Sequence, residues 1–301
     1  MIEAGDDRML EHSVGRFHLR RGLSVQGCRG VYEAEDGQGQ PVSVRTVCLD
    51  AERGLHRRLD NEYRSLTHLA GRGPAPAVIF AGRTATLRYL VTQWVDGRPL
   101  RERARRSDLR TLGRVLPATA TALAGLHVGG VVHGDLNGGN ILMGEGGRIY
   151  FVDFESSLVR DDPRPVQDLP RRVTWVHAAP ELYRAAQQHL PLVPTPASDQ
   201  YGLASLLYRY LTGHRHRDIP AIPESDRPLP STPPLPLEGA ATALWPRLPA
   251  VLATALADDP DHRHPTTGDF AHALHHAITP AAQPPDHRGP GLPAADRHST
   301  D

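Results

Sequence analysis

The sequence predicts an α+β fold with two lobes, a small β-rich N-terminal lobe and a larger helical C-terminal lobe. Short runs of alternating apolar residues, separated by turn signals, occupy residues 16–47 and 77–94, as in an antiparallel sheet. Leucines at helical spacing recur in much of the chain beyond residue 108. The polar string VVHGDLNGGNILM interrupts that helical pattern, so we expect the chemistry at the junction of the lobes.

The N-terminal lobe is expected over residues 15–96. Its runs VYEAED and PVSVRTV predict two strands joined by the turn DGQGQ. Leucines recur at helical spacing from Leu55 to Leu69 and predict an amphipathic helix over 52–70. The runs AVIFAG and RYLVTQW predict further strands, giving a lobe of about five strands and one helix.

The C-terminal lobe is expected over residues 97–277. We predict, in order, a helix over 108–128 that ends at Gly129 and Gly130, strands around 141–143 and 149–152, and helices that include 199–212 and 247–257. Residues 220–236 contain seven prolines, which predicts an extended surface loop.

The composition excludes some partners and places the ends of the chain outside the fold. A net charge of +0 with a pI near 7.3 argues against nucleic acid and anionic membranes as partners, and no apolar run is long enough for a membrane span. Residues 1–14 predict a mobile leader without a secretion signal, and the Pro- and His-rich residues 278–301 predict a disordered tail. Only Cys28 and Cys48 could pair, so a cytoplasmic location is the expectation. The oligomeric state stays open.

Three oxygen-bearing side chains have the spacing that phosphoryl transfer uses. Asp135 precedes Asn140 by five residues, and Asp153 follows Asn140 by thirteen, at the end of an apolar strand. A carboxylate such as Asp135 can orient and deprotonate a hydroxyl, while Asn140 and Asp153 can hold Mg²⁺ across nucleotide phosphates. Such a string also arises by chance in loops, but here an amphipathic helix precedes it and a strand follows it, as the motif requires. The pattern indicates a nucleotide-dependent kinase.

Together with further motifs, this string resembles the protein kinase superfamily, and specifically the bacterial, eukaryotic-like Ser/Thr protein kinases, over about residues 16–277. The resemblance implies a bilobal protein-kinase-like fold, ATP and Mg²⁺ as cofactors, and a protein or peptide substrate. It implies that Asp135 is the catalytic base and that Asn140 and Asp153 ligate Mg²⁺.

The resemblance also implies a nucleotide site at the junction of the lobes. The run RYLVTQWVDGRPL is similar to the family's hinge, where the Gln93 carbonyl and the Val95 amide would bind the adenine edge beside the gatekeeper Thr92. His133, Phe154 and Leu66 would pack in an apolar spine between the lobes. The residues expected to contact the nucleotide are Gly27, Val31, Ser43, Arg45, Glu62, Gln93, Val95 and Leu142.

A second stretch, TWVHAAPELY, resembles the end of an activation segment. By this resemblance Thr174 touches the catalytic aspartate near the acceptor, and Asp199 braces the backbone of the catalytic loop. Glu181 is expected to pair with Arg263 in a buried bidentate contact. The alternative for Glu181 and Arg263 is a solvent-exposed charge on each.

Several positions depart from the family pattern. Arg45 stands where a lysine is usual, with Glu62 as its expected partner, but all 34 basic residues of this chain are arginine. The glycine sites of the phosphate loop hold Ser24, Gln26 and Arg29. Arg29 could reach the phosphates, although a solvated side chain is the simpler expectation. Gly134 replaces an arginine that usually receives an activation-loop phosphate, Asn137 replaces a lysine that contacts the transferred phosphate, and Glu155 replaces a glycine.

These departures leave alternatives open. The chain could be a pseudokinase, a scaffold that binds nucleotide weakly. The HGD string also resembles the aminoglycoside phosphotransferases and other small-molecule kinases, although their pattern does not normally carry the Ala-Pro-Glu ending at 179–181. In a variant of the leading hypothesis, the acceptor is a biosynthetic precursor peptide.

Overall fold

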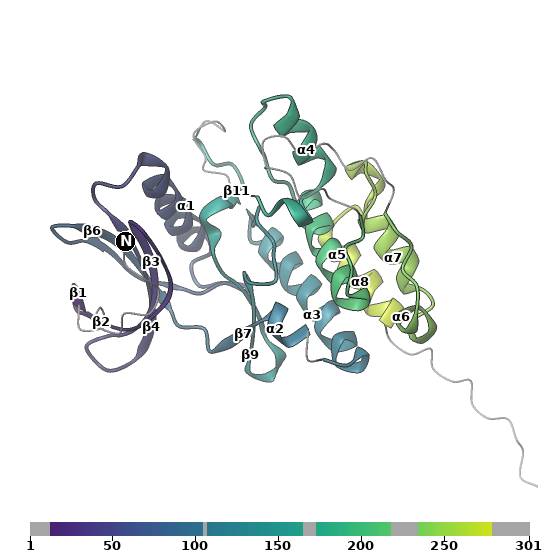
Figure 1. Cartoon of the computed structure of the whole chain (residues 1–301), viewed down its shortest axis with the longest axis horizontal. Helices are drawn as coiled ribbons and strands as arrows, with labels where there is room; N and C mark the ends of the chain where they lie inside the picture. Colours follow the sequence, from purple (N-terminus) through teal and green to yellow (C-terminus); the bar gives the residue numbers. More distant parts are fainter. Residues whose placement is uncertain (1–12, 105–106, 165–172, 218–233, 279–301) are drawn as a thin grey trace, which may run out of the picture.

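A six-stranded antiparallel sheet forms most of the N-terminal lobe of the computed structural model, which describes residues 13–104, 107–164, 173–217 and 234–278. The strand order is β1-β2-β3-β4-β6-β5 (Figure 1). The strands are β1 (Ser13–Val14), β2 (Phe17–Gln26), β3 (Arg29–Glu35), β4 (Pro41–Cys48), β5 (Val78–Arg83) and β6 (Leu87–Gln93). The sheet therefore starts at Ser13, two residues before the predicted boundary, and holds one more strand than expected.

The alternation of β4 decides which residues reach the junction of the lobes. Val42 and Val44 are buried in a small core that also contains Phe17 and Val91. Because successive strand residues point to opposite faces, Arg45 lies on the other face, where it meets the helix α1 (Arg53–Leu69) and the C-terminal lobe.

The helix α1 confirms the prediction from leucine spacing and is tied to the C-terminal lobe by polar contacts. Leu59, Leu66 and Leu69 are buried on its apolar face. Asn61 is also buried, and its Nδ2 donates to the carbonyl of Glu155 at 3.1 Å and to that of Ser157 at 2.9 Å. Since these carbonyls lie two and four residues after Asp153, the position of α1 is coupled to that of the predicted metal ligand.

The C-terminal lobe is mainly helical, as predicted. Its helices are α2 (Leu100–Ala104), α3 (Leu109–Val128), α4 (Pro180–Gln187), α5 (Pro196–Thr212), α6 (Ala240–Leu244), α7 (Leu248–Ala255) and α8 (Thr267–Ile278). The lobe also holds short strands. The strand β7 (Gly97–Pro99) precedes α2, and four more lie between α3 and α4, namely β8 (Val131–Val132), β9 (Ile141–Gly144), β10 (Ile149–Phe151) and β11 (Leu158–Val159). Asp108 caps α3 by accepting from the Thr111 amide at 2.8 Å, and Gly129 ends it. Leucines of α3, α5, α7 and α8 share one core with Phe154.

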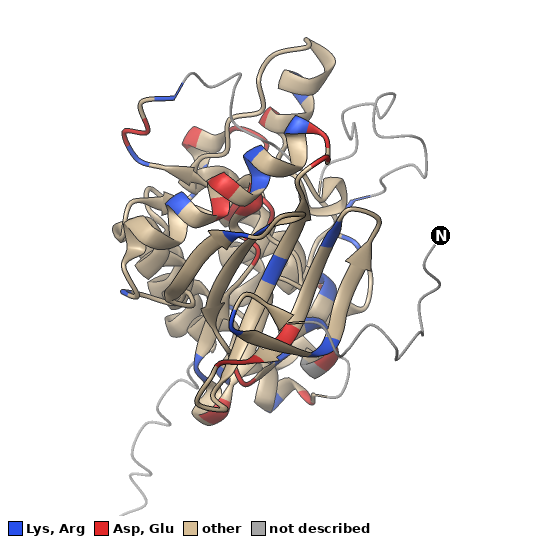
Figure 2. Cartoon of the chain, turned by 90° about the vertical axis from the view of Figure 1, so that its left-hand side faces the viewer, with Lys and Arg blue, Asp and Glu red and all other residues tan. Residues whose placement is uncertain are grey.

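Some predicted segments fall outside the described residues, namely the leader up to residue 12, the Pro-rich loop as far as residue 233 and the tail from residue 279. Among the described helices, none combines the length and the apolar character that a bilayer span needs. Figure 2 shows arginines and acidic residues interspersed over the N-terminal lobe, without a field of one sign.

The predicted pair of Glu181 and Arg263 is confirmed, and its arginine is buried. Arg263 NH1 and NH2 donate to Glu181 Oε1 and Oε2 at 2.8 and 2.7 Å, and the Arg263 side chain is 0% exposed. The same guanidinium donates to the carbonyls of Ala197 and Ala257 at 2.9 and 3.0 Å and lies over the ring of Tyr201. One arginine thus joins the start of α4, the start of α5 and the loop after α7.

We expect Arg263→Ala to reduce the free energy of unfolding by about 3–5 kcal/mol, because it leaves a carboxylate and two carbonyls without their donors. Chemical denaturation measures this change. The control is Arg21→Ala, which breaks an ion pair with Glu33 whose arginine is 66% exposed, so its cost should stay below about 1 kcal/mol. Equal costs for the two variants would contradict the structural role given to Arg263.

Candidate active site

The loop between β8 and β9 carries the predicted base, and one buried carboxylate holds it. Asp199 Oδ2 accepts from the His133 amide at 2.7 Å, and Oδ1 accepts from the Gly134 amide at 3.0 Å. His127, at the end of α3, lies with its Nε2 3.0 Å from Asp199 Oδ2, and its Nδ1 lies 2.8 Å from Thr267 Oγ1 on α8. The brace predicted for Asp199 is therefore present, and it draws on three helices.

The backbone at Gly134 explains why this chain has no arginine there. Gly134 has φ +79°, a conformation that glycine adopts at little cost, and a Cβ at this position would lie 2.5 Å from the Ser156 carbonyl oxygen. A larger side chain would therefore need the segment after Asp153 to move. An arginine that receives an activation-loop phosphate does not fit here.

Asp135 is held by the predicted partner Thr174. Its Oδ1 accepts from the Thr174 amide at 2.7 Å and from Thr174 Oγ1 at 2.6 Å. Asn137 Nδ2 lies 3.4 Å from Thr174 Oγ1, so the residue that replaces a lysine contacts the same threonine. Burial raises the pKa of Asp135, against the lowering effect of the hydrogen bonds from Thr174. A raised pKa favours proton uptake by this carboxylate, which suits a general base.

The orientation of Asn140 makes its side-chain oxygen available as a metal ligand. Asn140 Nδ2 donates to the Asp135 carbonyl at 3.0 Å, and the Val152 amide donates to the Asn140 carbonyl at 2.9 Å. Because the amide nitrogen is used in this way, Oδ1 is the atom left to face a ligand. An amide oxygen and the Asp153 carboxylate are the hard oxygen donors that Mg²⁺ prefers, so the donor set fits this ion.

Five charged side chains meet where β4, α1 and the segment after β10 converge. Arg45 Nε lies 2.8 Å from Glu62 Oε2, and Arg45 NH1 donates to Asp153 Oδ1 at 2.8 Å. Glu155 Oε2 lies 3.7 Å from Arg45 NH1 and 3.3 Å from Arg29 NH1. We call these residues the junction cluster: two guanidinium groups and three carboxylates.

The pKa shifts in the junction cluster follow from its excess of carboxylates. Burial raises the pKa of Glu62 to about 7, against the attraction of Arg45, and the charges of Asp153 and Glu155 add to the rise. Burial alone would also raise the pKa of Asp153, but Arg45 holds it below its usual value through its charge and its hydrogen bond. Near neutral pH the junction cluster can therefore take up a proton at Glu62.

The contact between Arg29 and Glu155 was not predicted. Arg29 was expected to be solvated, yet its side chain is 23% exposed, and that of Glu155 is 6% exposed. The available signal was that both residues depart from the family pattern and carry opposite charges. Because 126 positions separate them, no local periodicity could have joined them.

The residues expected to contact the nucleotide lie on several separate segments of the chain. Val31 faces Arg45 across the ladder of β3 and β4, and Ser43 of β4 faces Thr92 of β6. Gly27 lies in the turn between β2 and β3, and Gln93 lies at the end of β6. Leu142 of β9 lies opposite Pro99 of β7. Val95 lies between β6 and β7. Their roles toward a nucleotide stay predictions.

The predicted apolar spine lies in the core. Phe154 and Leu66 are 0% and 1% exposed and belong to one buried cluster. The ring centroids of His133 and Phe154 are 5.1 Å apart, and His133 Nε2 lies 3.0 Å from the Val152 carbonyl. The residue before Asp153 and the residue after it are thus both packed against the catalytic loop.

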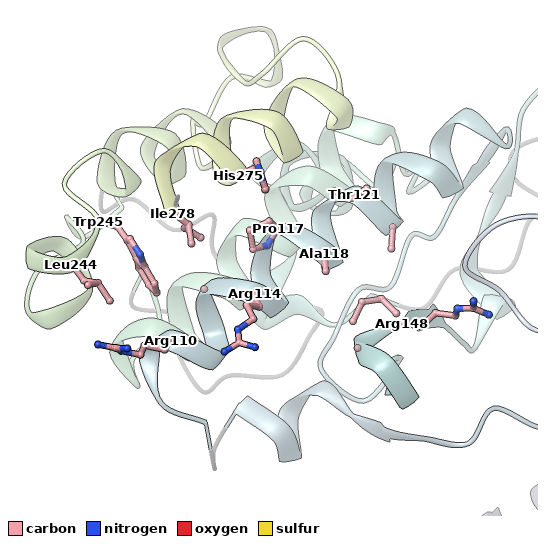
Figure 3. A pocket seen from close by; sticks show the side chains of 14 residues that line it. Arg110, Arg114, Pro117, Ala118, Thr121, Arg148, Leu244, Trp245, His275 and Ile278 are labelled. Atoms are coloured by element: carbon pink, nitrogen blue, oxygen red, sulfur yellow. The ribbon is translucent and has the colours of Figure 1, made fainter. Parts of the chain in front are cut away.

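Two pockets differ in their relation to this site. One, with a volume of about 790 Å³, is lined by Asn137 and Thr174, the neighbours of Asp135. A larger pocket of about 990 Å³ lies between α3 and α8, where Trp245 and Ile278 face Arg114 and Pro117 (Figure 3). None of the predicted site residues lines the larger pocket, so its size does not make it the catalytic centre.

Comparisons with known proteins agree with the motifs. A family model for APH, described as "Phosphotransferase enzyme family", matches residues 26–129. The serine/threonine-protein kinase PknH of Mycobacterium bovis is 29% identical over 295 residues, which cover 93% of this chain and 46% of that kinase. The serine/threonine-protein kinase PknA of Mycobacterium tuberculosis is 29% identical over 289 residues, covering 90% of this chain and 63% of that kinase. The chain spans less than two thirds of the length of either relative.

The pKa of Glu62 predicts a pH-dependent contribution to stability. Between about pH 4.5 and 7 the folded state holds a proton on Glu62 that the unfolded state has lost, so this group's contribution to the free energy of unfolding falls as the pH rises. Glu62→Gln should remove this contribution. Denaturation of both proteins across this range should show the wild type losing stability relative to the variant.

The matched control is Asp60→Asn, on the same helix, because the Asp60 side chain is 50% exposed. That variant should keep the pH dependence of the wild type. If Glu62→Gln and the wild type differ by the same free energy at every pH, the raised pKa is wrong.

Proposed function

We propose that this chain is a member of the protein kinase superfamily and transfers the γ-phosphoryl group of Mg-ATP to a serine or threonine hydroxyl of a protein or peptide. The family match and the two kinase relatives support the resemblance predicted from the motifs. The single observation that carries the proposal is the placement of Asp135. Thr174 holds its carboxylate, and the metal-ligand candidate Asn140 lies in the same loop as Asp135. The cytoplasmic location expected from the two cysteines stays a prediction.

Each polar group has a distinct part in the proposed reaction. Asp135 orients the acceptor hydroxyl and accepts its proton as the oxygen attacks phosphorus, while Thr174 fixes the direction of the carboxylate. Asn140 Oδ1 and Asp153 would hold Mg²⁺. Mg-ATP, when bound, supplies the phosphoryl group and the divalent charge that neutralises its phosphates. The residues of the chain therefore act by positioning and electrostatics.

Arg45 has two tasks in this proposal. Its Nε is fixed by Glu62, so its charge is directed toward the position proposed for the α- and β-phosphates. Its NH1 also neutralises Asp153, which would otherwise be a partly buried carboxylate without a cationic partner. A planar guanidinium can do both because its donors point in fixed, separate directions, and a lysine ammonium offers only a point charge.

A second candidate function, a pseudokinase scaffold, is favoured by this same contact. Arg45 occupies one oxygen of the Asp153 carboxylate, so metal binding must compete with an ion pair of 2.8 Å. Asn137 also stands where a lysine is usual, so one positive charge that would stabilise the transferred phosphate is missing. Against the scaffold stands the retention of Asp135, Asn140 and Asp153 together, since nucleotide storage does not need a base.

Asp135→Asn should abolish phosphoryl transfer while leaving the fold intact, because asparagine keeps the shape and the contact with Thr174 but cannot take a proton. We expect a fall in kcat of about 10²–10⁴-fold. Transfer of labelled phosphate from ATP to serine-containing acceptors measures it. The control Asp261→Asn changes an exposed residue of the loop after α7 and should keep full activity. Full activity of Asp135→Asn would remove Asp135 from the role of base.

Mg²⁺-dependent binding of ATP separates the enzyme from the scaffold. We expect ATP to raise Tm more with Mg²⁺ than without it. In Arg45→Lys the Mg²⁺ concentration that gives half of this rise should be lower, because lysine holds Asp153 less firmly. The matched control Arg88→Lys, on β6, should behave as the wild type. A Tm that ATP does not change with or without Mg²⁺ would favour the scaffold.

A further inference from the structure

A groove runs beside the catalytic loop, and no member of the junction cluster lines it. It has a volume of about 790 Å³ and lies between α2, the catalytic loop, the segment after Thr174 and the end of α5. Asn137 and Thr174 form its wall, and both contact Asp135 or its loop. A chain lying in this groove would therefore pass next to the carboxylate that is proposed to accept the proton.

Two glycines let large side chains approach the catalytic loop at this groove. A Cβ on Gly139 would lie 3.3 Å from Arg101 NH1, and a Cβ on Gly138 would overlap Tyr210 Oη and lie 2.9 Å from Arg101 Cβ. The backbone is joined as well, since the Arg101 amide donates to the Gly138 carbonyl at 3.0 Å. The guanidinium of Arg101 thus lies against the catalytic loop itself.

The charges that line the groove have one sign. Arg101 of α2 and Arg209 of α5 are both exposed, and among the described lining residues there is no aspartate or glutamate. In the described part of the chain neither arginine forms an ion pair with a carboxylate. Their charges are therefore directed at whatever enters the groove.

His177 also lines the groove, and the nearby positive charges affect its pKa. Burial, together with the charges of Arg209 and Arg215, lowers the pKa of His177 to about 4. The imidazole is neutral at pH 7 and lies with Nδ1 2.8 Å from Ser205 Oγ. It consequently adds no charge and leaves the arginines to set the potential.

We propose that this groove binds the acceptor as an acidic peptide segment, with Arg101 and Arg209 as the residues that select it. The proposal rests on the proposed function, because it assigns the substrate class of the same site. Carboxylates on both sides of the acceptor hydroxyl would meet the two guanidinium groups, and the region next to Asp135 would receive the hydroxyl. A polycationic acceptor such as an aminoglycoside meets like charges here and is disfavoured.

Direct binding tests the groove without any transfer reaction. Three fluorescein-labelled peptides share one serine and differ only in its neighbours, which are glutamate, glutamine or arginine. Anisotropy titrations of the full chain at low salt should show the acidic peptide binding about tenfold more tightly than the neutral one, and the basic peptide most weakly. Added salt should shrink this preference, since the arginines are exposed.

Charge reversal identifies the residues responsible. Arg101→Glu and Arg209→Glu should each reduce the preference about fivefold, and the double variant should bind the basic peptide more tightly than the acidic one. Arg209→Lys should keep the preference. Arg247→Glu, an exposed residue outside the groove, makes the same change of charge and should leave the order of the three peptides unaltered. A reversal of order is a result that partial unfolding cannot produce.

The outcomes separate this proposal from the proposed function. A wild type that binds the neutral peptide as well as the acidic one, or a double variant that keeps the original order, overturns the groove assignment. So does an aminoglycoside that binds more tightly than the acidic peptide and competes with it. If the binding order holds but no peptide receives phosphate from Mg-ATP, the groove assignment stands and the kinase proposal fails. If a peptide receives phosphate from Mg-ATP but the acidic peptide does not bind more tightly than the neutral one, the kinase proposal stands and the groove assignment fails.

Discussion

The buried carboxylate of Asp199 is the constraint on which the arrangement of the active site depends. Two backbone amides of the catalytic loop point at it, and His127 links it to Thr267 on α8. Hydrogen bonds to an ionised group are stronger than neutral ones, and a buried carboxylate without donors is costly, so the loop has little freedom to leave this geometry. The helices of the C-terminal lobe therefore fix where Asp135 lies, through one residue that does not itself face the acceptor.

At the other side of the site the constraint is a balance of charge. The junction cluster holds two arginines and three carboxylates that are buried or partly buried, so each member is stabilised by its neighbours. Bound phosphates would bring negative charge close to Arg45 and Arg29, and a metal would bring positive charge close to Asp153. Because these additions have opposite signs, metal and nucleotide are expected to bind better together than apart. Protonation of Glu62 offers a further way to adjust the balance.

Residue patterns in the sequence were sufficient to predict most of the fold and the contacts between residues of recognised motifs. Helical spacing located α1 and α3 to within a residue or two, and motif resemblance paired Thr174 with Asp135 and Glu181 with Arg263. The sequence could not pair Arg29 with Glu155, since both depart from the pattern and the register of distant segments brings them together. The charge of the groove was also hidden, because Arg101 and Arg209 stand on helices that no motif joins.

The departures from the family pattern are better explained as mutual adjustments than as decay. Gly134 carries no side chain because the Ser156 carbonyl occupies the space where a Cβ would lie. Glu155 adds a carboxylate, and Arg29 of the eroded glycine loop neutralises it. Random loss of a catalytic site would leave buried charges without partners, and such charges cost several kcal/mol each. Here each charge of the junction cluster has an opposite charge within 4 Å, so the residues that depart from the family pattern compensate one another electrostatically.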